Sequence, residues 1–185
     1  GEGYHTGKPA YFIRLAGCDV NCHWCDVKES WDISEDQHLS IDEIISNVIK
    51  YPAETVIITG GEPLMHNLTE LTDALKEKNK KIHLETSGTH PISGHFDWIC
   101  FSPKKFKNPL DDFFKLSNEL KIIIYNDSDF IWAEELLKKI KNNPKLTLQP
   151  EWSKSKEINP KILKYIKSNP KWRISLQTHK YLNVE

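Results

Sequence analysis

The hydrophobic pattern of the chain alternates between two kinds of segment. Short runs of β-branched and aromatic residues predict buried strands, and longer runs with apolar residues three or four positions apart predict amphipathic helices. In the clearest helix, Ser40 supplies an N-cap and Glu43 completes a capping box. The predicted strands are Ala10–Leu15, Thr55–Thr59, Lys81–Thr86, Trp98–Phe101, Glu119–Tyr125, Lys145–Gln149 and Trp172–Leu176, and the predicted helices are Ser40–Lys50, Leu68–Lys78, Asp129–Lys141 and Asn159–Lys167.

This order of elements predicts an α/β fold with parallel strands, because alternating strands and helices form right-handed βαβ units. A full eight-fold barrel takes roughly 250 residues, and the chain has 185. We therefore expect an incomplete, compact (β/α) barrel with a parallel sheet of about six strands, forming a single domain over residues 1–185. The chain begins with Gly1 rather than Met, so we expect the natural protein to extend upstream.

Polar and glycine-rich strings follow six of the predicted strands. Parallel strands end on one face, where α/β barrels build their active sites, so we expect these strings to meet there. They are Gly17 with the cysteines after it, Gly60–Pro63, Glu85–Gly88, Ser102–Lys104, Gln149–Glu151 and Gln177–Lys180.

Composition and charge argue against a nucleic-acid-binding protein and against a membrane protein. Lysine and arginine number 25 and aspartate and glutamate 26, for a net charge of −1, so there is no excess positive charge for nucleic acid or an anionic membrane. No run approaches the 18 or so apolar residues of a transmembrane helix. Nothing at the start resembles a secretory signal, so we expect a cytoplasmic protein.

Three of the four cysteines, Cys18, Cys22 and Cys25, lie within eight residues. This spacing lets three thiolates converge on an iron–sulfur cluster, which usually has four protein ligands. Three ligands would leave one iron open for chemistry. The alternatives are a structural zinc site completed by His5 or His23, or a pair of thiols without a function. Cys100, in an apolar strand, is interpreted as a small buried hydrophobic residue.

The string Gly60-Gly61-Glu62-Pro63 follows a buried strand. Its glycines allow a ligand to approach the backbone closely, and the Glu62 carboxylate suits an ammonium group. Together with the cysteine triplet, this loop resembles the radical S-adenosylmethionine enzymes. The resemblance implies a 4Fe–4S cluster whose open iron binds the methionine end of S-adenosylmethionine. It also implies a 5′-deoxyadenosyl radical that removes a hydrogen atom from the substrate.

Further strings place the resemblance within one family. FIRLAGC around Arg14, TGGEP at 59–63, ETSG at 85–88, SPK at 102–104, LQP at 148–150 and QTHK at 177–180 are together similar to the 7-carboxy-7-deazaguanine synthase family. The resemblance implies ring contraction of 6-carboxy-5,6,7,8-tetrahydropterin to 7-carboxy-7-deazaguanine with loss of ammonia, a step toward queuosine. It further implies a homodimer, Mg²⁺ and a reductant protein such as flavodoxin or ferredoxin, with no nucleic-acid or membrane partner.

The same resemblance implies roles for individual residues. The cysteine triplet would hold the cluster, and Arg14 and His179 would be catalytic as well as substrate-binding. Arg14 offers a planar fork for the substrate carboxylate, and Glu2 can accept a hydrogen bond from the 2-amino edge of the pterin. The implied S-adenosylmethionine contacts are Gly61, Glu62, Ser87, Ser102, Pro103, Lys104, Gln149, Pro150, Glu151 and Trp152, and the implied substrate contacts are Gly1, Glu2, Arg14, Thr59, His179 and Glu185.

The sequence departs from the family pattern beside the last cysteine. The family usually has Asp-Thr there, with the threonine hydroxyl on Mg²⁺, whereas this chain has Asp26-Val27. Two alternatives follow: substrate oxygens with Asp26 or Glu29 hold the ion more weakly, or Lys28 replaces it.

Two other functions compete with the synthase. A glycyl-radical enzyme activase shares the cysteine triplet but acts on a protein. A zinc-binding interaction module would use the same cysteines without any catalysis.

Overall fold

The computed structural model describes residues 2–183 and contains one parallel sheet of seven strands. The strands lie side by side in the order of the sequence, from β1 at one edge to β7 at the other, so the barrel is not closed. This confirms the expected incomplete (β/α) barrel. The strands are β1 (Ala10–Leu15), β2 (Thr55–Gly60), β3 (Lys81–Thr86), β4 (Trp98–Phe101), β5 (Glu119–Ile124), β6 (Lys145–Pro150) and β7 (Trp172–Ile174).

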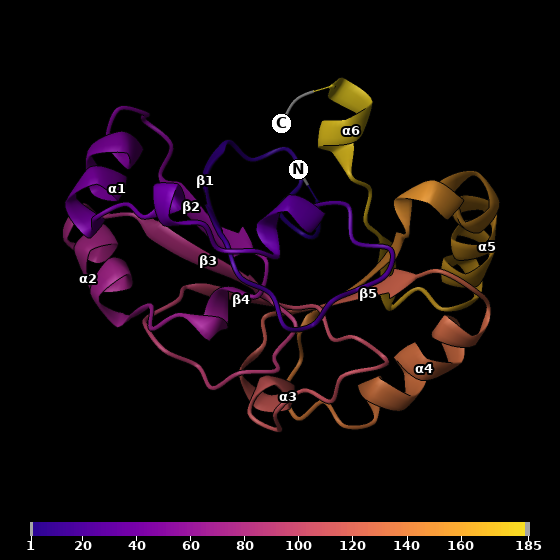
Figure 1. Cartoon of the computed structure of the whole chain (residues 1–185). Coiled ribbons are helices and arrows are strands. Elements are labelled where there is room, and N and C mark those ends of the chain that lie inside the picture. The colour runs from indigo at the N-terminus through magenta and orange to yellow at the C-terminus, as the bar shows by residue number, and fades with distance from the viewer. Residues whose placement is uncertain (1, 184–185) are drawn as a thin grey trace.

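Four longer helices cover the outside of the curved sheet. In Figure 1, α1 and α2 lie over one half of the sheet, and α4 and α5 lie over the other. Two short helices and four 3₁₀ turns complete the described chain. The α-helices are α1 (Ile41–Val48), α2 (Thr69–Glu77), α3 (Phe113–Leu116), α4 (Ser128–Leu137), α5 (Ser155–Ser168) and α6 (Thr178–Leu182), and the 3₁₀ turns are η1 (Lys28–Ser30), η2 (Glu35–Gln37), η3 (Pro63–Met65) and η4 (Trp152–Lys154).

The hydrophobic core lies between the outer face of the sheet and these helices. Successive side chains of a strand point to opposite faces. In β5, Leu120 and Ile122 are fully buried in the core, whereas Glu119 and Lys121 belong to the other, inner face. Arg14 and Glu85 line the hollow on that inner face. The inner face is therefore polar and available for a site.

All seven predicted strands are confirmed, as are the four predicted helices, with shifts at some ends. The helix expected from Asn159 begins at Ser155. The reason is that the Glu151 carboxylate caps the preceding turn, accepting from the backbone N–H groups of Ser153 and Lys154. The helix expected to reach Lys141 ends at Leu137. Helices α3 and α6 are too short for a periodic pattern to predict them.

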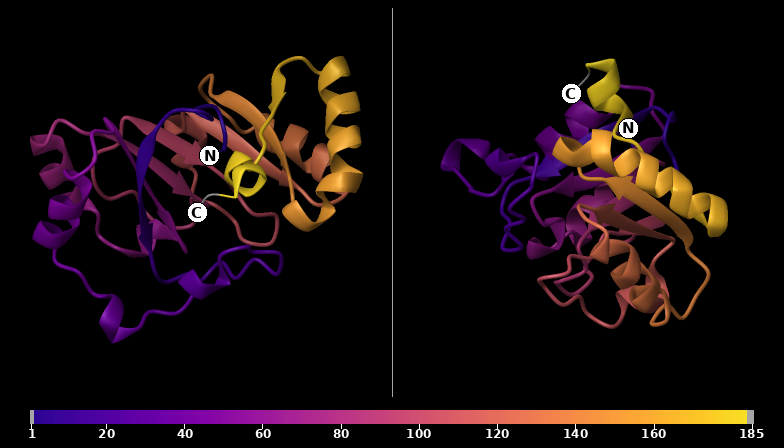
Figure 2. Two further views of the ribbon diagram at one scale, coloured as in Figure 1. Left: turned by 90° about the horizontal axis from the view of Figure 1, so that it is seen from above. Right: turned by 90° about the vertical axis from the view of Figure 1, so that its right-hand side faces the viewer.

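The two ends of the described chain lie side by side over the inner face of the sheet. Figure 2 shows the N-terminal segment and α6 together there in both views. The Gly3 N–H donates to Ser175 Oγ at 2.8 Å, and the Tyr4 N–H lies 3.1 Å from both Glu119 oxygens. Residues far apart in the sequence thus jointly cover the hollow.

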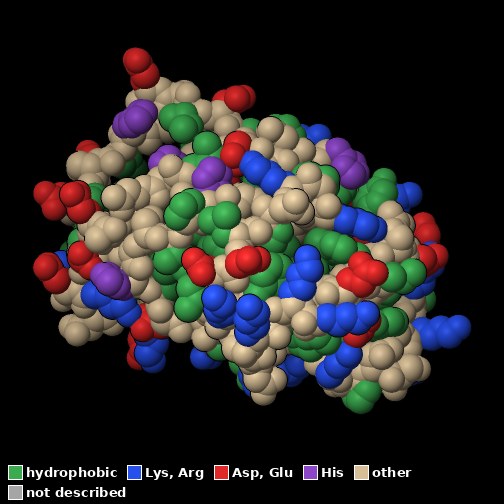
Figure 3. All heavy atoms as spheres, turned by 90° about the horizontal axis from the view of Figure 1, so that it is seen from below, with side chains coloured by type: hydrophobic (Ala, Val, Ile, Leu, Met, Phe, Trp, Pro, Cys, Tyr) green, Lys and Arg blue, Asp and Glu red, His purple; other side chains and the backbone are tan. Residues whose placement is uncertain are grey.

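The surface carries charges of both signs. The face in Figure 3 mixes lysine and arginine with aspartate and glutamate around exposed hydrophobic side chains. Within residues 2–183, none of the helices is long and apolar enough to cross a membrane.

We expect Ser40→Ala to lower the free energy of unfolding by about 1 kcal/mol. The Ser40 hydroxyl accepts from the Glu43 N–H at 3.2 Å, and the Glu43 carboxylate accepts from the Ser40 N–H at 2.8 Å. Urea denaturation followed by circular dichroism measures the loss. The matched control is Ser46→Ala, an exposed serine within the same helix, which should change stability by less than about 0.5 kcal/mol. Equal losses in both variants would contradict the capping argument.

Candidate active site

A cavity of about 670 Å³ opens on the inner face of the sheet. Residues from both halves of the sheet and from both chain ends line it. Nearly all the described residues to which the sequence assigned a site role are among them: Glu2, Arg14, Cys18, Cys22, Cys25, Thr59, Gly61, Glu62, Ser87, Ser102, Lys104, Gln149, Pro150, Glu151, Trp152 and His179. Pro103 is instead part of a smaller neighbouring groove. Gly1 and Glu185 lie outside the described residues.

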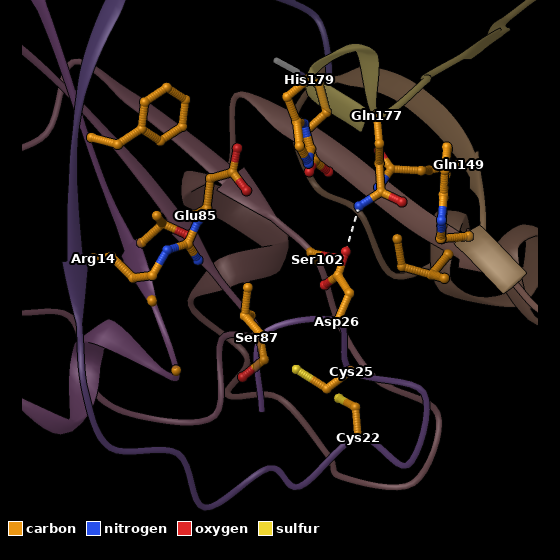
Figure 4. Close-up of a pocket in the computed structure, with 18 of the residues that line it drawn as sticks. Arg14, Cys22, Cys25, Asp26, Glu85, Ser87, Ser102, Gln149, Gln177 and His179 are labelled. Atoms are coloured by element: carbon orange, nitrogen blue, oxygen red, sulfur yellow. Dashed lines mark hydrogen bonds between the residues drawn. The ribbon is translucent and has the colours of Figure 1, made fainter. Parts of the chain in front are cut away.

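The cysteine loop follows β1 and forms one wall of this cavity. The Cys25 N–H donates to the Cys22 carbonyl at 2.8 Å, which closes a turn between them. Figure 4 shows both thiols directed toward the same part of the pocket. Burial raises the pKa of Cys22 to about 11, so the thiol is protonated near pH 7, and binding of a cluster would displace this proton.

The donor set fits a cluster with three protein ligands better than a zinc ion. No three His, Cys, Asp or Glu side chains within residues 2–183 could hold a single metal ion together. In a 4Fe–4S cluster each thiolate binds a different iron, so its ligands need not converge on one point. Of the two proposed zinc-completing histidines, His5 packs against Trp98 and His83, and His23 against Tyr125. Cys100 is buried in β4, as expected, and is not among the lining residues.

The glycine loop after β2 joins the cysteine loop to the sheet. The Gly61 N–H donates to the Leu15 carbonyl at 2.9 Å, and the Glu62 N–H donates to the Gly17 carbonyl at 2.8 Å. A Cβ atom on Gly61 would lie 2.1 Å from the Gly17 carbonyl oxygen and 2.9 Å from Cys18 Cβ. Glycine is therefore required at position 61 for this approach of the two backbones.

The Glu62 side chain differs from its expected role. The sequence of the loop predicts that this carboxylate faces a ligand ammonium group. In the structure it is buried, and both oxygens accept hydrogen bonds from the protein: Thr86 Oγ1 and the Leu64 N–H on one, Ser87 Oγ and the Ser87 N–H on the other. Glu62 thus links the ends of β2 and β3, and the backbone of the loop is what remains to meet a ligand.

Burial lowers the pKa of two basic residues on the cavity wall, Lys104 and His179. The Lys104 ammonium donates to the carbonyl and the hydroxyl of Ser102, and burial lowers its pKa. Burial also lowers the pKa of His179 in α6, which favours the neutral imidazole near pH 7. A neutral imidazole has one donor nitrogen and one acceptor nitrogen.

The substrate-binding residues expected from the sequence, Arg14 and Glu2, both line the cavity. Arg14 comes from edge strand β1 and is exposed to it. Among the described residues no carboxylate forms an ion pair with Arg14, so its guanidinium is available to an anion. The Glu2 carboxylate instead lies 2.8 Å from Lys121 Nζ. Burial would raise the pKa of Glu2, but the charge of Lys121 outweighs it and lowers this pKa to about 2.

Asp26, beside the cluster loop, contacts side chains of the C-terminal segment. Its carboxylate accepts from Gln177 Nε2 at 2.8 Å, the dashed contact in Figure 4, and from the Lys180 ammonium. Val27 offers no oxygen ligand. These side chains do not fit the oxygen-rich shell of Mg²⁺, and Mg²⁺ stays a prediction from the resemblance.

Two further residues belong to this region although the sequence motifs assign no role to them. Glu85 lines the cavity from β3, and the ammonium of Lys121 in β5 lies 2.8 Å from the Glu2 carboxylate, behind the cavity lining. The signal for Lys121 was present, because a lysine among the buried isoleucines of a strand needs a counter-charge. Glu85 belongs to the polar string Glu85–Gly88, but the resemblance to the family implies no role for it.

Comparisons with known proteins agree with this geometry. Residues 12–106 match the radical SAM superfamily. The chain is 55% identical to the 7-carboxy-7-deazaguanine synthase of Flavobacterium psychrophilum, over all of this chain and 87% of that protein. It is 36% identical to that of Escherichia coli K12, over all of this chain and 94% of that protein. The crystal structure of QueE from Escherichia coli matches with a TM-score of 0.83 and 33% identity, covering 96% of this chain and 89% of that one.

The family expected from the sequence motifs is thereby confirmed by similarity along the whole chain and by the fold. Neither the activase nor the zinc module is favoured by these relatives. The chain belongs to the radical S-adenosylmethionine superfamily and, within it, to the 7-carboxy-7-deazaguanine synthase family.

Proposed function

We propose that the chain converts 6-carboxy-5,6,7,8-tetrahydropterin to 7-carboxy-7-deazaguanine with loss of ammonia, in the biosynthesis of queuosine and related 7-deazapurines. The observation that carries the proposal is the composition of one cavity. It combines three cysteine thiols with an arginine that pairs with no described carboxylate, and with a partly buried, ionised glutamate, Glu2. A cluster site and a site for an anionic, N–H-rich ring therefore share one enclosed space.

The cofactors are a 4Fe–4S cluster and S-adenosylmethionine. When bound, they supply one electron and the 5′-deoxyadenosyl radical that removes a hydrogen atom from the substrate. Cys18, Cys22 and Cys25 would hold three irons of the cluster. The backbone at Gly61, together with Ser102, Lys104 and the Gln149–Trp152 segment, would bind S-adenosylmethionine. Ser87 would contribute through its position beside Glu62, with which it shares a 2.5 Å hydrogen bond.

The opposite wall would hold the substrate. Arg14 would bind its carboxylate through two parallel N–H donors. Glu2, ionised near pH 7, would accept from the amino edge of the ring, and Thr59 and His179 would fix the ring from β2 and α6. In Figure 4, Arg14, Glu85 and His179 lie on the side of the pocket away from Cys22 and Cys25. This separation leaves space for S-adenosylmethionine between the cluster and the ring.

The proposal also covers the reductant, the oligomeric state and the cellular location. The cluster needs a one-electron reductant, such as flavodoxin or ferredoxin. We further propose a homodimer in the cytoplasm, acting on a small molecule rather than on nucleic acid or a membrane.

The direct test is anaerobic incubation of the reconstituted protein with S-adenosylmethionine, a reductant and carboxytetrahydropterin. We expect 7-carboxy-7-deazaguanine and 5′-deoxyadenosine, detected by mass spectrometry. A protein that carries iron and sulfide and cleaves S-adenosylmethionine, yet leaves the pterin unchanged, would contradict the substrate but not the superfamily. A colourless protein that binds zinc would support the interaction module.

We expect alanine at Cys18, Cys22 or Cys25 to abolish cluster-dependent cleavage of S-adenosylmethionine, because two protein ligands do not retain a catalytic cluster. Iron content and the broad absorbance of the reconstituted protein measure the loss. Cys100→Ala is the matched control, since that thiol is buried away from the cavity lining. Loss of the cluster from a folded Cys100→Ala protein would mean that Cys100 is a ligand.

We expect Arg14→Ala to weaken use of the pterin by about 2–5 kcal/mol in kcat/KM, with little change in the binding of S-adenosylmethionine. Arg14→Lys should recover only part of this loss, because lysine keeps the charge but not the planar fork. Steady-state kinetics and calorimetric binding separate the two ligands. If product formation and S-adenosylmethionine binding fall in parallel, Arg14 does not bind the substrate carboxylate.

A further inference from the structure

Lys121 is a buried cation at the centre of the inner face of the sheet. Its side chain is only 4% exposed, and its ammonium lies 2.8 Å from Glu2 Oε2 and 2.9 Å from Glu85 Oε2. The three residues come from the N-terminal segment, β3 and β5. A lysine that bridges two carboxylates from two other segments fixes their relative position.

The balance of charges at this bridge favours ionised groups. Burial opposes the charge of Lys121, but the two carboxylates outweigh burial and raise the pKa of its ammonium above the ordinary value. The same ion pair keeps the pKa of Glu2 low despite burial. Lys121 therefore stays charged, and it neutralises part of the negative charge that two carboxylates would place beside an anionic substrate.

A chain of hydrogen bonds continues from this bridge to the N-terminal segment. Gln149 donates to the Glu2 carboxylate and accepts from Ser175 Oγ at 2.7 Å. Ser175 Oγ in turn accepts from the Gly3 N–H at 2.8 Å. Glu2 is thus held at both its side chain and the backbone that follows it, and within residues 2–183 Lys121 is the lysine that forms an ion pair with it.

We propose that Lys121 is a positioning residue: its buried ammonium holds Glu2 and Glu85 side by side as a two-carboxylate acceptor for adjacent N–H groups of the substrate ring. This inference rests on the proposed function, because it takes the substrate to be a pterin. Both carboxylates line the cavity, whereas Lys121 lies behind them and does not contact the ring. A nitrogen heterocycle without adjacent N–H donors would leave the pair unsatisfied, so the pair selects for the amino-pyrimidinone edge.

The test compares Lys121→Met with the unaltered holoenzyme. We expect KM for the pterin to rise about tenfold or more, since truncating one partner of a buried charge pair is costly. The Kd of S-adenosylmethionine should change by less than about threefold. The matched control is Lys161→Met, a lysine that also bridges two carboxylates, Asp127 and Glu157, but at the surface. Exposed pairs contribute little, so this variant should keep its KM.

A pH profile separates positioning from a general loss of structure. Without Lys121, only the weaker effects of Gln149 and His179 oppose the burial of Glu2. The pKa of Glu2 therefore rises, and the acid limb of kcat/KM should move to higher pH. The other titratable groups around the bridge are Glu85, Cys100, Glu119, Lys104 and His179. All of them remain in both proteins. An unchanged KM and an unshifted acid limb in Lys121→Met would overturn the proposal.

A triple variant covers the case in which Lys121→Met does not fold. Glu2→Gln, Glu85→Gln and Lys121→Met together remove all three charges of the bridge. If Lys121 acts through the two carboxylates, the triple variant should have a KM within about threefold of that of Glu2→Gln with Glu85→Gln. A larger further rise in KM would contradict the positioning role. Failure of the unaltered enzyme to convert the pterin would instead contradict the proposed function.

Discussion

The polar inner face of the sheet is the constraint on which the rest of the structure depends. An open parallel sheet can bury apolar residues against helices on its outer face, and the four longer helices, α1, α2, α4 and α5, cover that face here. The inner face then holds charged side chains that are largely removed from water, and each needs a partner. At the centre of the inner face, the Lys121 ammonium forms ion pairs with the Glu2 and Glu85 carboxylates. The same polar face is what makes the hollow chemically useful.

Two close approaches of the chain turn this face into a site. Gly61 allows the loop after β2 to contact the backbone of the cysteine loop, which places the thiols against the sheet. At the other side, Glu119 accepts from the Tyr4 N–H and draws the N-terminal segment over the hollow. Burial raises the pKa of Glu119. The two contacts thus hold the cysteine loop and the N-terminal segment, which both line the cavity.

Helix α6 lies beside the cysteine loop and also contributes to the lining of the cavity. Lys180 and Gln177 contact Asp26, which directly follows the last cysteine. Trp152 packs against Tyr181 with a centroid distance of 5.3 Å. His179 lies between these contacts along the chain, so its imidazole is held at the mouth of the cavity by residues on both sides of it. Helix α6 is too short to be stable by itself, so its contacts with Asp26 and Trp152 stabilise it.

The sequence by itself determined the strand and helix order, the open parallel barrel and the family, because periodicity and contiguous motifs are local properties. It also identified Arg14 and the cysteines, since an arginine in an apolar strand and a cysteine triplet are unusual in themselves. Only the tertiary structure decided that Glu62 is saturated by Thr86 and Ser87, and that Lys121 joins two distant carboxylates. Those outcomes depend on contacts between segments far apart in sequence, which no local pattern of residues encodes.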